Sequence, residues 1–143
     1  MKQEFRVEAL DFGDEWPPLR VRITREQVRR YARAANMPGG RFASDEAARR
    51  EGLPGMIVPG NMSMALFSRM LVRGPRVRLQ RLSATFRGLV RPEVPLTLRA
   101  VVTDKQVLPE GTQLECDLLL ENPEGERLVT GTATVLVLPD GTG

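Results

Sequence analysis

The stretch LPGMIVPGNMSMAL at residues 53–66 could present backbone N–H groups to a ligand, because a rigid approach leads directly into a helix start. Two prolines and two glycines fix the approach, and Met62, Met64 and Leu66 supply apolar side chains after it. The polar Asn61 is a favourable N-cap residue, and Gly60 allows a tight approach. The sequence thus predicts a helix over 62–73, capped by Asn61, whose first N–H groups are available to a ligand.

The chain contains no histidine, which limits the chemistry available to it. This absence excludes Ser-His-Asp and Cys-His catalysis and the usual zinc sites. Any catalysis would have to use carboxylates, Tyr31, Cys116, lysine, hydroxyls or backbone groups. Asp45 and Glu46 stand in the predicted first turn of a short helix, where acids usually stabilise the helix dipole. We expect neither a metal ion nor a cofactor.

The composition is that of one globular domain over residues 1–143, with 41% hydrophobic and 27% charged residues. No apolar run reaches membrane-spanning length, and acidic residues at the N-terminus argue against a secretory signal. The single Cys116 cannot form an internal disulfide, which favours a cytoplasmic protein. The net charge of +3 comes from scattered arginines with few aromatics, so we expect no nucleic-acid partner and no membrane partner.

The first half of the chain predicts short elements joined by breakers. Segments 4–10 and 18–23 are expected to be extended, with a turn-rich stretch between them. A helix over 24–35 begins with a capping box formed by Thr24 and Gln27. Ser44 is expected to cap a second helix over 45–51, which Gly52 ends. The third helix, 62–73, is apolar around most of its circumference and should be buried.

The second half of the chain predicts long antiparallel strands. Segments 76–90, 95–108, 112–121 and 126–138 alternate in polarity and are rich in Val, Leu and Thr. The segment 122-NPEG-125 predicts a tight turn with Gly125 in the left-handed region. Early helices followed by long strands indicate the α+β class, with one buried helix wrapped by the sheet.

Several segments in the same order resemble the MaoC-like dehydratases, a family that includes (R)-specific enoyl-CoA hydratases. They are Tyr31-Ala32, 45-DEAAR-49, 52-GLPG-55, the residues Ile57, Gly60, Met64 and Ala65, 83-SATFRGLVRP-92 and 121-ENPEGERLVTGTATVLVLP-139. The segment 83-SATFRGLVRP-92 is similar to the family pattern F-R-x-P-V-x-P-G-D. The resemblance implies a hot-dog fold, in which a curved antiparallel sheet grips a central helix. It also implies dimers or double hot dogs that bind acyl thioesters where two units meet.

In active members of that family, the motif G-D-x-N-P-[I/L]-H supplies an Asp and a His that activate water. In this chain the histidine position falls on Ala43, and the aspartate position falls on Pro38 or, with one insertion, on Met37. The family segment A-H-G-M corresponds to residues 58-VPGN-61, in which only Gly60 is retained. The acid and base of the family's hydration reaction are therefore absent from these positions.

Three hypotheses follow from this resemblance. The first is a non-catalytic subunit that binds acyl-CoA or an acyl-carrier thioester, as a homodimer or with a dyad-bearing paralogue. The second is an active enoyl-CoA hydratase, dehydratase or thioesterase with relocated acid and base groups. The third is a homodimeric interaction module for an unrelated apolar ligand. The residues expected to bind substrate surround the start of the central helix: Pro59, Gly60, Asn61, Met62 and Ser63.

Overall fold

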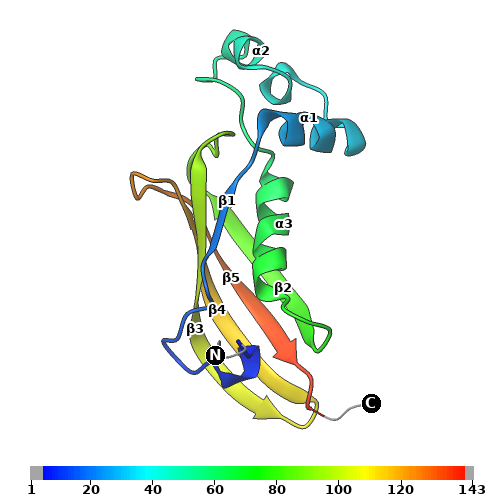
Figure 1. The fold of residues 1–143 in the computed structure, drawn as a ribbon, viewed down its shortest axis with the longest axis vertical. Coiled ribbons are helices and arrows are strands. Elements are labelled where there is room, and N and C mark those ends of the chain that lie inside the picture. Colours follow the sequence, from blue (N-terminus) through cyan, green and yellow to red (C-terminus); the bar gives the residue numbers. More distant parts are fainter. Residues whose placement is uncertain (1–4, 141–143) are drawn as a thin grey trace.

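One curved antiparallel sheet wraps around a central helix in the computed structural model, which describes residues 5–140 (Figure 1). The strands are β1 (Leu19–Arg22), β2 (Val77–Phe86), β3 (Pro95–Leu108), β4 (Gly111–Glu121) and β5 (Arg127–Val137). They lie in the order β1-β3-β4-β5-β2, and every neighbouring pair is antiparallel. The helices are α1 (Arg25–Ala34), α2 (Asp45–Arg50) and α3 (Gly60–Leu71), with 3-10 turns η1 (Val7–Ala9) and η2 (Gly40–Phe42). This arrangement is the predicted hot-dog fold.

The core lies between α3 and one face of the sheet. Alternate residues of β3 and β4, such as Leu98 and Leu120, are fully buried, as is Phe67 of α3. Cys116 occupies the same face of β4, as its phase with the neighbouring leucines predicted. Burial raises the pKa of its thiol to about 12, so the group remains protonated and unreactive at neutral pH.

Local sequence signals placed several elements correctly. The capping box is present, with Thr24 Oγ1 accepting from the Gln27 N–H at 3.1 Å and the Gln27 side chain accepting from the Thr24 N–H at 2.8 Å. Ser44 Oγ accepts from the Ala47 N–H and caps α2. Gly125 has a φ of 78° in the turn between β4 and β5. Each signal depends on residues at most three apart, which is why it could be recognised from the sequence.

The expectation of an extended segment over 4–10 was wrong for residues 7–9, which form the 3-10 turn η1; Glu4 lies outside the described residues. Val7 and Leu10 are both buried, and a turn brings side chains three apart to the same side. The turn is also held from outside, because Lys105 Nζ donates to the Glu8 carbonyl oxygen at 3.1 Å.

Helix α3 begins two residues earlier than predicted, so Asn61 is not its N-cap. Pro59 takes the N-cap position, and its carbonyl accepts from the N–H groups of Met62 and Ser63 at 3.0 and 3.3 Å. Asn61 therefore lies exposed inside the first turn. The expected burial of the helix is partial: Phe67, Met70 and Leu71 are buried, whereas Asn61, Ala65 and Arg69 are exposed along one side. Among residues 5–140, no helix has the length and apolar character needed to span a membrane.

Candidate functional site

The start of α3 presents backbone donors without a protein acceptor. Pro59 is buried and offers no capping side chain, and within residues 5–140 the N–H groups of Gly60 and Asn61 have no hydrogen-bond partner. The ring of Phe86, at the end of β2, lies over this start: a Cβ on Gly60 would be 2.9 Å from Phe86 Cζ. A side chain at position 60 would displace the Phe86 ring. An uncapped helix start beside an aromatic ring is suited to an oxygen acceptor on an apolar group.

The five residues expected to bind substrate do not all face one space. Gly60 faces Phe86, Asn61 faces solvent, and half-buried Met62 lines a cavity beside β1 and α1. Residues two apart in a helix point about 200° apart, so Gly60 and Met62 lie on different sides of α3. Ser63 is completely buried, and its Oγ has no hydrogen-bond partner among the described residues.

The positions that correspond to the family's catalytic pair do lie together. Met37, Pro38 and Ala43 all line one cavity of about 430 Å³ between α1 and η2. The other residues of its wall are Arg29, Ala32, Arg33, Asn36, Gly39 and Phe42. None of these side chains is a carboxylate or an imidazole, so the wall offers no general acid or base with a pKa near neutrality. The two cationic side chains and the apolar wall could instead hold a ligand without transforming it.

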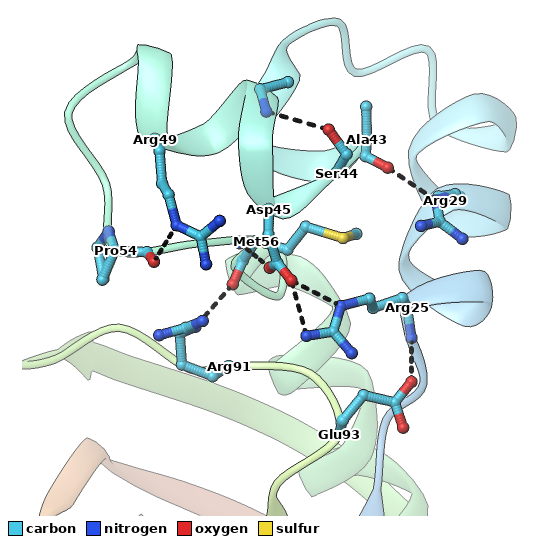
Figure 2. Close-up of polar contacts among 11 residues, drawn as sticks. Arg25, Arg29, Ala43, Ser44, Asp45, Arg49, Pro54, Met56, Arg91 and Glu93 are labelled. Carbon is cyan, nitrogen blue, oxygen red and sulfur yellow. Dashed lines mark hydrogen bonds and ion pairs between the residues drawn. The ribbon is translucent and has the colours of Figure 1, made fainter.

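Asp45 connects four parts of the molecule rather than only stabilising the start of its helix. Its Oδ2 accepts from Arg25 Nε and Nη2 at 3.1 and 2.8 Å, and its Oδ1 accepts from the Met56 N–H at 2.9 Å (Figure 2). The carbonyl oxygen of Met56 in turn accepts from Arg91 Nε at 3.0 Å. Asp45 thus ties α2 to α1 and, through Met56, to the segment that follows β2.

The same contacts decide what Asp45 can do chemically. The Met56 N–H, followed by the Arg25 guanidinium, lowers the pKa of Asp45 below its ordinary value of 3.8. A carboxylate that is already bonded through both oxygens and is hard to protonate is a poor candidate for a relocated general base or acid. Glu46, the other acid considered from the sequence, is exposed and pairs with Arg50 at 2.7 Å.

Glu93 is a structural residue that the sequence did not reveal. Its Oε2 accepts from the backbone N–H of Arg25 at 2.9 Å, so a side chain 68 residues away satisfies one of the free donors of α1 (Figure 2). Glu93 has a φ of 64°, in the left-handed region that favours glycine. In the pattern F-R-x-P-V-x-P-G-D aligned on Phe86, position 93 is the glycine, and this was the one available signal of an unusual backbone there.

Arg29 connects α1 to Ala43, the residue that follows η2. Its Nε donates to the carbonyl oxygen of Ala43 at 2.7 Å, the shortest of the side-chain contacts drawn in Figure 2. The contact closes η2 against α1 and holds Ala43 at the wall of the 430 Å³ cavity. The position that corresponds to the family's histidine is therefore held in place by its backbone, with a methyl group as its side chain.

Comparisons with known proteins agree with this geometry. The family described as "FAS1-like, dehydratase domain region" matches residues 11–114. No curated protein sequence matches the chain. Among solved structures, the MaoC-like dehydratase from Rhodospirillum rubrum has 22% identity and a TM-score of 0.78 over 94% of this chain and 97% of its own. The (R)-hydratase from A. caviae involved in PHA biosynthesis has 22% identity and a TM-score of 0.79 over 92% and 98%.

A heteromeric assembly is also among the similar structures. The HadBC (3R-hydroxyacyl-ACP dehydratase) complex from Mycobacterium tuberculosis contains a chain with 21% identity and a TM-score of 0.68, covering 87% of this chain and 96% of its own. At these identities the solved structures establish the fold, and the family match over most of the chain establishes the relationship. The chain belongs to the FAS1-like dehydratase-region family and has the hot-dog fold of the MaoC-like dehydratases and (R)-hydratases.

Proposed function

We propose that this protein is an acyl-thioester-binding hot-dog subunit that lacks the acid and base of its hydratase relatives. The observation that carries the proposal is the wall of the 430 Å³ cavity. Met37, Pro38 and Ala43 stand where the dyad is expected, and no carboxylate or imidazole is present on that wall. The remainder of the chain cannot supply the missing base as a histidine, because the sequence contains none.

The start of α3 supports retention of thioester binding. The unpartnered N–H groups of Gly60 and Asn61 can donate to a thioester carbonyl, and the half-exposed Phe86 provides apolar surface beside it. We therefore assign the carbonyl to Gly60 and Asn61, with Pro59 positioning the backbone. In this assignment Met62 and Ser63 support the helix from the cavity beside β1 and from the core rather than touching the carbonyl.

The edge of the sheet supports pairing with a second hot-dog chain. Strand β2 pairs only with β5 among the described strands, which leaves the other side of a ten-residue strand open. An open edge of this length exposes unsatisfied backbone groups and is usually covered. Phe86 ends this strand and Leu89 lies three residues beyond it; they are 48% and 43% exposed, so a chain that covered the edge would also bury apolar surface.

The partner we propose is a dyad-bearing paralogue. Structures similar to this chain include the HadBC complex and the ChsH1–ChsH2 complex from Mycobacterium tuberculosis, and both are assemblies of two named components. In such a pair, this chain would contribute thioester contacts and sheet surface while the other chain contributes acid and base. The protein would then be active only in the pair.

Titration of the purified protein with butyryl-CoA, a saturated thioester that cannot be hydrated, tests the binding function. We expect saturable binding by calorimetry and loss of at least tenfold in affinity in Gly60→Ala, because the added Cβ meets the Phe86 ring at the helix start. Ala65→Ser also adds one heavy atom to α3 but at an exposed position, and it should bind like the parent. Absence of binding by the parent, or equal binding by both variants, would contradict the proposal.

A further inference from the structure

A second cavity lies on the side of α3 away from Phe86 and is lined by residues of β1, α1 and α3. Its volume is about 440 Å³. The floor is apolar and includes Ile23 and two side chains one helical turn apart, Met62 and Leu66. We name it the arginine cavity, because Arg22, Arg30 and Arg69 stand around this floor, one from each of the three elements.

The charges of this cavity are not balanced by protein groups. No acidic residue lines it, and within residues 5–140 Arg22, Arg30 and Arg69 form neither an ion pair nor a side-chain hydrogen bond. Other cavities differ. In three of them an acidic residue, either Glu8 or Asp117, lines the same wall as the arginines. In the cavity at Ala43, the guanidinium groups of Arg29 and Arg33 lie 3.7 and 3.6 Å from the carboxylate of Glu26.

We propose that the arginine cavity binds an organic phosphate ester. Three guanidinium groups around one apolar floor fit a dianion better than a monocarboxylate, because a phosphate ester carries about −1.5 to −2 charges at neutral pH and three acceptor oxygens. Arginine pairs with such oxygens through two parallel donors, and the three side chains come from three elements around one floor. The organic part of the ligand lies on Ile23, Met62 and Leu66.

The site is independent of the thioester function proposed above. Met62 points about 200° around α3 from Gly60, so a ligand on the arginine cavity does not occupy the helix start beside Phe86. Two kinds of organic group could occupy the floor: an aromatic base, which could contact Tyr31 at the cavity wall, or an alkyl chain. Both share the same phosphate chemistry, and the experiment separates them.

Thermal unfolding and calorimetric titration with adenosine 5′-monophosphate and with octyl phosphate test the proposal, with adenosine, octanol and inorganic phosphate as controls. We expect at least one ester to raise the Tm and bind saturably, more weakly at high salt, while the uncharged controls have no effect. A preference for the nucleotide would identify an aromatic ligand, and a preference for octyl phosphate would identify an alkyl ligand. No binding of either ester, or equal binding of the uncharged controls, would overturn the proposal.

Variants locate the binding. Arg22→Gln, Arg30→Gln and Arg69→Gln each remove an exposed, unpaired side chain, so each should fold like the parent and weaken ester binding about tenfold. Arg33→Gln is the matched control, since it lies on α1 but lines the cavity at Ala43. In methyl NMR, the Met62 signal should shift with ester while the fully buried Met56 stays unchanged. Unchanged affinity in all three variants, or a shift at Met56 without one at Met62, would overturn the assignment.

Discussion

Two regions of this molecule depend on apolar burial and on polar contacts in different proportions. The sheet and α3 bury aliphatic and aromatic side chains such as Phe67, Leu98 and Leu120 completely. Residues 25–58, which we name the overhang, lie beyond one end of the sheet and contain α1, η2 and α2 (Figure 1). The overhang contributes fewer side chains to the same core, among them Val28, Phe42 and Met56, and adds polar contacts: Asp45 pairs with Arg25 at 2.8 Å and Glu51 pairs with Arg41 at 2.9 Å.

The difference explains how such a fold can keep its architecture while its chemistry changes. Burial of apolar area is non-directional, so the sheet unit retains its shape when side chains of similar volume are exchanged. The overhang places the segment from Met37 to Ala43 partly through directional bonds, such as that from Arg29 to the Ala43 carbonyl, and the side chains of Met37, Pro38 and Ala43 take no part in them. Replacing these side chains changes chemistry at little cost in stability.

The largest expected effect is in the core of the sheet unit. Phe67→Ala should reduce the free energy of unfolding by about 3–5 kcal/mol, because a fully buried aromatic ring leaves a cavity behind. Urea denaturation measures this loss. Phe86→Ala makes the same chemical change at a ring that is 48% exposed and should cost far less. Equal losses in the two variants would show that burial on α3 does not hold the unit together.

Asp45→Asn should loosen the overhang and leave the sheet intact. The wild-type carboxylate has a lowered pKa, so its stabilising contribution is fully present above the ordinary value of 3.8 and is lost as the pH falls below that value through the lowered one. In the variant this acid dependence should shrink, and hydrogen exchange at the Met56 N–H should accelerate while exchange in β4 is unchanged.

Glu46→Gln is the control for Asp45→Asn, because it removes an acid from the adjacent position of the same helix turn. Glu46 is exposed and its pair with Arg50 lies at the surface, so its loss should alter neither exchange at Met56 nor the acid dependence. If the two variants behaved alike, the dipole of α2 rather than the contacts to Arg25 and Met56 would be the main role of Asp45.

The smallest expected effect concerns the strained backbone where the sheet meets the overhang. Glu93→Gly and Glu93→Ala both lose the acceptor for the Arg25 N–H, but only glycine adopts a φ of 64° without a steric cost. The glycine variant should therefore be more stable than the alanine variant by about 1 kcal/mol. Thermal unfolding of the pair measures this difference, and a more stable alanine variant would refute the account of position 93.

The sequence predicted those parts of the molecule whose causes are local. Strands β2 to β5, the turn at Gly125 and the caps at Thr24 and Ser44 follow from alternation and from residues a few positions apart. The start of α3 was misplaced because Asn61 is a good N-cap by composition. The competing signal was Pro59, which takes the N-cap position with a φ of −58°. Its carbonyl oxygen accepts the first hydrogen bonds of the helix, from the N–H groups of Met62 and Ser63.

Long-range contacts account for what could not be predicted. The turn at Val7–Ala9 depends on Lys105, and the N-terminus of α1 depends on Glu93, in each case more than sixty residues away. Asp45 was correctly placed in the first turn of its helix, yet its bonds to Arg25 and Met56 exist only in the folded chain. The spatial grouping of Met37, Pro38 and Ala43 was expected from the family resemblance and not from their residue types.

Hydration of crotonyl-CoA by the purified protein alone tests the central claim most directly. The reaction is followed by the loss of absorbance of the conjugated thioester. Crotonyl-CoA is supplied above the concentration at which butyryl-CoA saturates the protein. The cavity wall beside Ala43 offers no acid or base, so we predict a rate equal to that of buffer even when thioester is bound. Hydration well above buffer that co-purifies with the protein would contradict the claim and require an acid and a base elsewhere in the chain.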